Sequence, residues 1–175
     1  MLNYDATTRR LHALLAVGVV VQLLLSLGMD PEAKVGTAAT LFEIHETLGL
    51  ILVVVVAAHW VWALTGHAPA GIGALWPWFS RKRLLALKQD IGARLHGGGT
   101  ASGPFVSAIH GLGLLLVAAM TLSGLIWWLG VEAAKDIHET VAPLVWAYLV
   151  GHVAAAVWHQ WRGEPLITRM LRLRR

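Results

Sequence analysis

Four long apolar segments, separated by polar stretches, dominate the pattern of this chain. They cover about residues 11–27, 41–64, 105–129 and 137–161, and none carries an acidic or basic residue in its middle. A helix needs roughly 20 apolar residues to cross a bilayer. Because the hydrocarbon core offers no water to backbone N–H and C=O groups, such segments must be helical. The pattern predicts an all-α membrane protein, a four-transmembrane-helix bundle forming a single domain over residues 1–175.

Basic residues lie mostly on one side of these spans. With a cytoplasmic N-terminus, twelve of the fourteen Lys and Arg residues fall in the N-terminal segment, the 66–104 loop and the C-terminal tail. Only Lys34 and Lys135 fall on the other side. Since cytoplasmic loops are enriched in Lys and Arg, we expect both termini and the 66–104 loop to be cytoplasmic.

The composition excludes several kinds of cofactor site and partner. Charged residues make up 14% of the chain, against about 25% in soluble proteins. The absence of cysteine excludes disulfides, iron–sulfur clusters, thiolate zinc sites and covalently attached c-type haem. The net charge of +4 comes from residues that flank the membrane, so no nucleic-acid partner is expected. The nine tryptophans suit a protein in contact with membrane lipid, because tryptophan favours membrane interfaces.

The second and fourth spans repeat a histidine pattern. The second opens with Ile-His-Glu-Thr at residues 44–47, and the fourth opens with the same four residues at 137–140. In each span a second histidine follows after thirteen residues, which gives the pairs His45 with His59 and His138 with His152. The first and third spans each have a histidine near their cytoplasmic start, His12 and His110. The chain therefore resembles two related helical hairpins.

This spacing places two imidazoles on one helix face. Fourteen positions are about 3.9 turns, or about 21 Å along the axis. Each of these helices therefore offers one imidazole near each membrane surface. Two imidazoles that far apart on one helix cannot share a zinc ion, and the spans lack the acidic residues of a cation path. A haem-free, histidine-containing transporter is therefore the weaker alternative.

Paired imidazoles in a membrane bundle favour haem. Two opposed histidines hold haem iron from both sides, which leaves no open position and suits electron transfer. His45 and His138 lie at the same depth near the outer surface and form the clearest pair. His152 is the best inner candidate, and its partner is His12, His59 or His110. The internal symmetry and the depth of the residues favour His59.

Other polar features have weaker assignments. His159, seven residues after His152, is a secondary candidate for contact with a haem propionate or a quinone, whereas His67 and His96 fall in the cytoplasmic loop without a special role. The basic, amphipathic stretch 81–88 in that loop predicts either a helix lying on the anionic inner leaflet or docking a partner, or a solvated loop that only sets the topology.

The chain resembles the bacterial cytochrome b561 family over nearly its whole length. The resemblance rests on Arg-Leu-His at 10–12, Ile-His at 44–45, His110 with Gly124, His-Glu-Thr at 138–140, His-Val-Ala-Ala-Ala at 152–156, and His159. It implies two b haems in a multi-pass protein of the bacterial inner membrane. The axial ligands to iron would be His45 with His138 and His12 with His152. The chain departs from the family pattern at His59, where an arginine is common.

The resemblance also implies partners. The family is thought to exchange electrons with the quinone pool of the respiratory chain, which makes ubiquinone a candidate cofactor. One branch resembles superoxide oxidase, which passes electrons from superoxide to quinone. Related cytochrome subunits anchor a hydrogenase or dehydrogenase complex and accept electrons from a partner subunit. Here Lys34 and Lys135 stand among seven outer acidic residues, so general attraction of an anion such as superoxide is weak.

Overall fold

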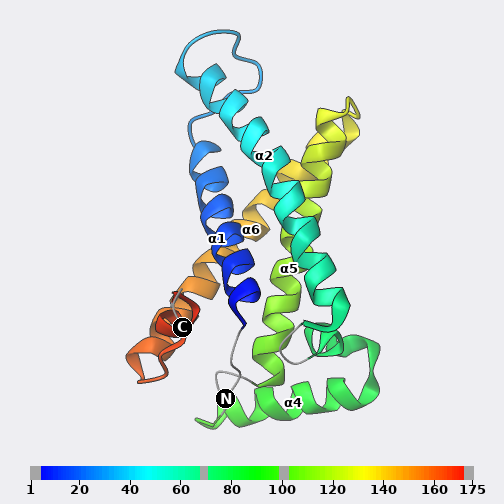
Figure 1. Cartoon of the computed structure of the whole chain (residues 1–175), viewed down its shortest axis with the longest axis vertical. Helices are drawn as coiled ribbons and strands as arrows, with labels where there is room; N and C mark the ends of the chain where they lie inside the picture. The colour runs from blue at the N-terminus through cyan, green and yellow to red at the C-terminus, as the bar shows by residue number, and fades with distance from the viewer. Residues whose placement is uncertain (1–4, 68–70, 99–102, 172–175) are drawn as a thin grey trace.

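Four long helices form the body of the protein. The computed structural model describes residues 5–67, 71–98 and 103–171, and within these residues there is no β-strand. The long helices are α1 (Ala6–Leu25), α2 (Thr37–Trp62), α5 (Pro104–Trp128) and α6 (Ala133–Trp161), as Figure 1 shows. Each is long and apolar enough to cross a membrane. The predicted all-α bundle of four spans is confirmed.

Local capping explains why the helices extend beyond the apolar segments. At the start of α1, the Asp5 carboxylate accepts a hydrogen bond from the Thr8 backbone N–H at 2.9 Å, so the helix begins five residues before the apolar run. Pro104 occupies the first turn of α5, where its missing N–H costs nothing. Gly66 and Gly130 have φ values of 92° and 96° where the chain leaves α2 and α5, a conformation that favours glycine.

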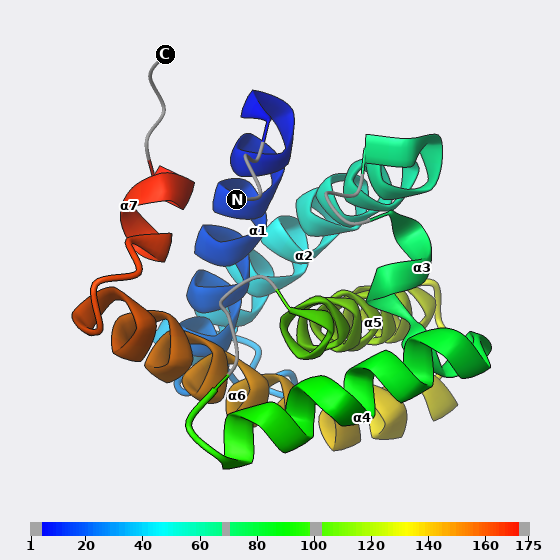
Figure 2. The same ribbon diagram turned by 90° about the horizontal axis from the view of Figure 1, so that it is seen from below.

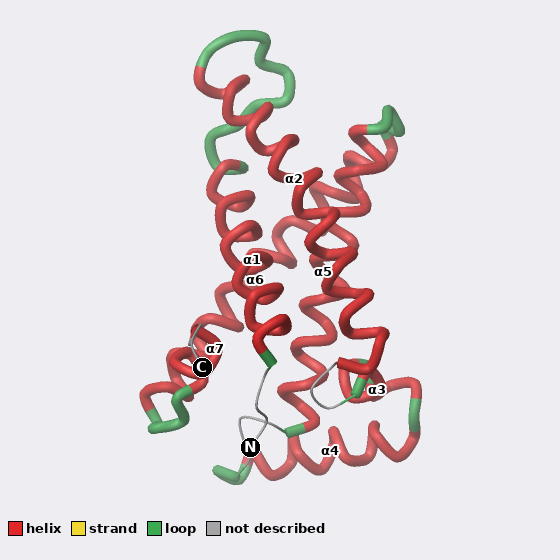
Figure 3. Tube along the Cα trace, in the orientation of Figure 1, coloured by secondary structure: helices red, strands yellow, loops and turns green. Residues whose placement is uncertain are grey.

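The helices pack mainly with their neighbours in sequence. The chief contacts join α1 to α2, α2 to α5 and α5 to α6, and neither α1 nor α2 is a principal neighbour of α6. Central α5 has the most buried residues, Ala108, Gly111, Gly113, Leu114, Val117 and Ser123. Figure 3 shows loops joining the helices at the two ends of the bundle. We call the end with residues 26–36 and 129–132 the connection end, and the end with both termini the terminal end.

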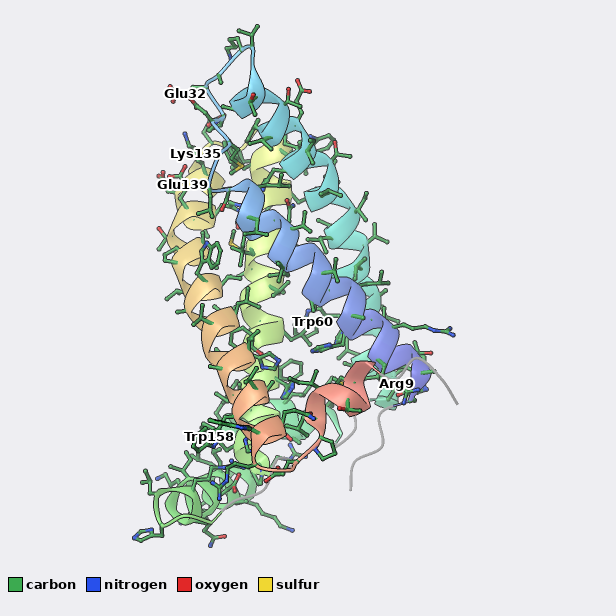
Figure 4. All side chains as sticks on the ribbon, turned by 90° about the vertical axis from the view of Figure 1, so that its left-hand side faces the viewer. Arg9, Glu32, Trp60, Lys135, Glu139 and Trp158 are labelled. Atoms are coloured by element: carbon green, nitrogen blue, oxygen red, sulfur yellow. The ribbon has the colours of Figure 1, made fainter. Side chains whose placement is uncertain are left out.

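The outward faces of the long helices are apolar. Val17, Val54 and Val150 are each more than 60% exposed, although they lie well inside their helices. Such a surface would be unfavourable in water and is the natural one for helices surrounded by acyl chains. Polar side chains gather at the ends instead: Figure 4 shows Glu32, Lys135 and Glu139 at the connection end, and Arg9 and Trp158 at the terminal end.

Short elements fill the terminal end. They are η1 (Ala63–His67), α3 (Ile72–Leu75), η2 (Pro77–Phe79), α4 (Arg81–Leu95) and α7 (Leu166–Leu171). Gly111 lets α3 approach α5 closely, because a Cβ there would collide with the Leu75 carbonyl oxygen. Figure 2 shows α4 lying across this end of the bundle beside α5. The predicted 66–104 loop thus contains a full helix over its basic stretch.

Candidate functional site

His45 and His138 meet near the connection end. Their ring centroids are 6.3 Å apart and their planes are nearly perpendicular, at 88°. The two residues come from α2 and α6, which are not principal packing partners. The imidazoles therefore face each other across a space between helices rather than within a tight helix contact.

Hydrogen bonds fix the proton on the His138 ring. Its Nδ1 lies 3.0 Å from the Met120 carbonyl oxygen and 3.2 Å from Ser123 Oγ. Because a carbonyl oxygen only accepts, Nδ1–H is the donor, and the neutral ring keeps its lone pair on Nε2. Histidines that bind metals typically donate their second N–H in this way. Opposite, Gln22 donates to the His45 backbone carbonyl at 2.9 Å and ties α1 to this turn of α2.

Two aromatic rings and an ion pair lie on the His138 side of this pair. The Trp127 ring lies 6.3 Å from that of His138 and 6.1 Å from that of Phe42. The Lys135 ammonium lies 5.6 Å from the centre of the Trp127 ring and 4.0 Å from a Glu139 carboxylate oxygen. The pair thus has apolar walls and one paired cation beside it.

His12 and His152 meet near the terminal end. Their ring centroids are also 6.3 Å apart, with planes at 47°. They come from α1 and α6, again helices that are not principal neighbours. The Tyr148 ring stacks on that of His152 at 5.5 Å and 15°. Gly113 makes room for Tyr148, because a Cβ on Gly113 would collide with the Tyr148 ring.

Two more histidines lie at the terminal end. The His110 ring meets that of His152 edge-on at 5.2 Å, and its Nδ1 donates to the Val106 carbonyl at 2.7 Å. His12 lies near His59, His110 and His152, so each long helix contributes one imidazole here. Among the described residues, His59 makes no ring contact with His152, and its buried Nδ1 has no hydrogen-bond partner.

The ring separations in both pairs are compatible with one iron held between two imidazoles. Two metal–imidazole bonds of about 2 Å each, with each ring centroid roughly 1 Å further out, separate the centroids by about 6 Å. The observed 6.3 Å matches this in both pairs. The 5.2 Å between His110 and His152 is too short for the same arrangement. Within the described residues, no group of three or more His, Asp or Glu side chains is arranged to hold one metal ion, so the facing pairs suit haem better than structural zinc.

The remaining candidate histidines have local partners. His159 Nδ1 lies 3.3 Å from a Glu164 carboxylate oxygen in the last turn of α6. His67 stacks on Trp62 at 3.7 Å, and His96 Nδ1 lies 2.8 Å from the Gly92 carbonyl oxygen. None of these three is in ring contact with the two pairs within the described part of the chain.

Sequence reasoning did not assign a role to the side chains that hold the histidines. Tyr148 stands four residues before His152, so the i, i+4 helix spacing could have drawn attention to it. Trp127 and Ser123 carry no such signal, because they reach His138 from another helix.

A comparison with known protein families identifies the family of this chain. A family model described as prokaryotic cytochrome b561 matches residues 3–173, nearly the whole chain. No curated protein and no solved structure gives a significant match. The family implies b-type haem, for which the facing histidines are suitable ligands. The chain is a multi-pass membrane protein that belongs to the prokaryotic cytochrome b561 family, b-type cytochromes of transmembrane electron transfer.

Proposed function

We propose that this cytochrome binds two b haems, one between His45 and His138 and one between His12 and His152. The matching 6.3 Å separations of the two pairs carry the proposal. His12 is preferred to His59 as the partner of His152, because its ring faces that of His152 at the separation that one iron requires.

The protein's own residues would hold the two haems and shield them from water. When bound, each haem supplies a one-electron iron couple at its own depth in the membrane. The Nδ1–H of His138 fixes Nε2 as its ligating atom, and Tyr148 restricts the ring of His152. Ligation from both sides leaves no position open, so a redox partner exchanges electrons without binding iron.

We further propose the bacterial inner membrane as the location, with the terminal end in the cytoplasm. Twelve of fourteen basic residues belong to segments that lead to that end. We infer that the partner is the quinone pool, as the family resemblance implies. The alternative is that the chain anchors a hydrogenase- or dehydrogenase-type complex. Purification in mild detergent separates these two cases, because a complex would bring a flavin or metal subunit with it.

Counting haem in single variants tests the ligand assignment. His12→Ala, His45→Ala, His138→Ala and His152→Ala should each lose one haem per chain, measured as haem-to-protein ratio. His59→Ala should keep both, and His67→Ala, at a residue stacked on Trp62, is the control. Double variants sharpen the test: His45→Ala with His138→Ala should lose one haem, whereas His45→Ala with His152→Ala should lose two.

Two results would contradict specific parts of the assignment. Loss of haem in His59→Ala, with both retained in His12→Ala, would make His59 the ligand opposite His152. A purified protein that is colourless and binds no added haem would reject the cytochrome function and favour the histidine-containing transporter.

One observation supports a second candidate function, the oxidation of superoxide coupled to quinone reduction. Lys135 places a cation over Trp127, whose ring adjoins that of His138. Glu139 offsets much of that charge, so the attraction is local and weak. Lys135→Gln should slow haem reduction by superoxide, whereas Lys34→Gln should not. Equal rates in both variants would remove this support.

A further inference from the structure

Helix α4 is locked against the start of α5. The Asp90 side chain, only 11% exposed, accepts a hydrogen bond from the Phe105 backbone N–H at 2.9 Å and pairs with Arg94 at 3.4 Å. The Arg94 guanidinium lies 5.2 Å from the centre of the Phe105 ring. Gly103 makes room for Asp90, because a Cβ there would collide with the carboxylate. These contacts fix the rotation of α4 about its own axis.

With that face against α5, the helix exposes an apolar stripe. Leu84, Ile91 and Leu95 are spaced i, i+7 and i+11, which places them within about 40° of one another around the helix. They are 36%, 37% and 81% exposed. We call these three residues the apolar stripe.

The opposite side of α4 carries a matched stripe of two polar residues and one alanine, which we call the polar stripe. Lys82, Gln89 and Ala93 have the same spacing and lie about 200° around the helix from the apolar stripe. All three are exposed. The two stripes therefore flank the contact with α5, with three large apolar residues on one side and Lys82 and Gln89 on the other.

The position of α4 identifies what covers the apolar stripe. The helix lies across the terminal end of the four helices that are long and apolar enough to cross a membrane (Figures 1 and 2). Just before it, Trp78 and Phe79 are 44% and 80% exposed, and aromatic side chains favour this boundary. Leaving the stripe in water would forgo its burial energy, roughly 25 cal/mol per Å² of apolar surface.

The charge of the segment points to anionic lipid. Between residues 71 and 98 the one acidic residue is Asp90, which already pairs with Arg94. The basic residues beside it are Arg81, Lys82, Arg83, Lys88 and Arg94. Lys88 and Arg81 border the apolar stripe, so their long side chains can reach headgroup phosphates while the stripe contacts acyl chains.

We propose that α4 is an interfacial helix that inserts Leu84, Ile91 and Leu95 into an anionic leaflet at the terminal end. Arg81 and Lys88 bind the lipid phosphates, and the Asp90 lock transmits that anchoring to α5. The inference rests on α4 and its contacts, and it holds whether or not the haem assignment does.

Spin labelling of the full-length protein in bilayers tests this directly. The sequence has no cysteine, so a single introduced cysteine carries one nitroxide. Labels at Leu84→Cys, Ile91→Cys and Leu95→Cys are compared with labels at Lys82→Cys, Gln89→Cys and Ala93→Cys. In bilayers containing phosphatidylglycerol, the apolar stripe should relax several-fold more with oxygen than with a water-soluble nickel chelate. The polar stripe should show the reverse.

Three outcomes would overturn the proposal. Equal access of the nickel chelate to both stripes would place α4 in water. Protection of both stripes from both reagents would mean that protein, not lipid, covers the helix. A contrast between the stripes that is the same in pure phosphatidylcholine would reject the anionic part. An unchanged far-UV circular dichroism spectrum and melting temperature of each labelled variant verify that the protein is folded.

Discussion

Gly124 of α5 lies directly against the imidazole of His138 on α6. A Cβ at position 124 would come within 3.0 Å of His138 Cε1. The preceding residue, Ser123, approaches Nδ1 of the same ring. One turn of α5 therefore sets both the position and the protonation of a histidine on another helix.

Enlarging residue 124 should displace His138. Gly124→Val should lower occupancy of the haem at the connection end, because overpacking costs about 1–3 kcal/mol and the ring must move to relieve it. Gly151→Val is the matched control, since a Cβ at Gly151 meets no atom within 4 Å. The haem-to-protein ratio measures the effect. Equal loss in both variants would attribute it to helix propensity rather than to contact with His138.

Removing the Ser123 hydroxyl should raise one haem potential. Ser123→Ala deletes one of two acceptors near His138 Nδ1–H, which makes Nε2 a weaker electron donor to ferric iron. The reduction potential of the haem proposed beside His138 should shift upward, and that of the second proposed haem should not change. Optical redox titration resolves the two, and Ser107→Ala on the same helix is the control. A shift in both haems, or in neither, would contradict this role.

Tyr148 should matter for its ring rather than its hydroxyl. Tyr148→Ala leaves a cavity beside His152 and should loosen the haem at the terminal end, because deleting a large aromatic ring typically costs 3–5 kcal/mol. Tyr148→Phe preserves the stacked ring and should retain the haem. Haem loss on dilution measures this difference. Equal retention in the two variants would show that the stacking is dispensable.

The Asp5 cap of α1 should make the stability of the protein depend slightly on pH. Partial desolvation raises the pKa of Asp5, but hydrogen bonds from the Thr8 side chain and backbone outweigh it and hold that pKa below its ordinary value of 3.8. Because the pKa of Asp5 is lower in the folded protein, its carboxylate stabilises the fold at pH values above the ordinary pKa. This contribution is lost as the pH falls through the lowered pKa. Thr8 Oγ1 also accepts from Trp62 Nε1 at 3.0 Å, so the cap joins α1 to the end of α2.

Thermal unfolding in detergent tests this cap. At pH 7, Asp5→Ala should destabilise the protein by about 0.5–1 kcal/mol, near the lower end for helix caps because the residue is exposed. The deficit should shrink as the pH drops below the ordinary value of 3.8. Glu32→Gln, at an exposed residue of the first connection, is the control. A deficit that does not change with pH would mean that the carboxylate charge is irrelevant.

Much of the fold could be predicted from the sequence because a bilayer permits very few backbone structures. The four spans followed from apolar length, since backbone groups in a bilayer must pair within the helix. The start of α1 did not follow, because the Asp5 cap extends this helix five residues into polar sequence, whereas α5 begins at Pro104, one residue before its predicted start. The repeated Ile-His-Glu-Thr motif also singled out His45 and His138, since identical positions on two helices share a depth.

The partner of His152 was beyond sequence reasoning from the residues. Symmetry and depth favoured His59, and only the family resemblance suggested His12, whose ring the fold brings to 6.3 Å from that of His152. Periodicity fixes the height of an imidazole along its own helix. The direction in which it points relative to another helix depends on how the helices pack.

The sequence by itself determined that the chain crosses a membrane four times and carries imidazoles at two depths, because apolar length and helical periodicity are local properties. The tertiary structure decided which imidazoles face each other, that Gly124 and Tyr148 border them, and that α4 is locked with one apolar side free. Those relations join residues far apart in the chain, and they depend on helix rotation and spacing, which packing alone sets.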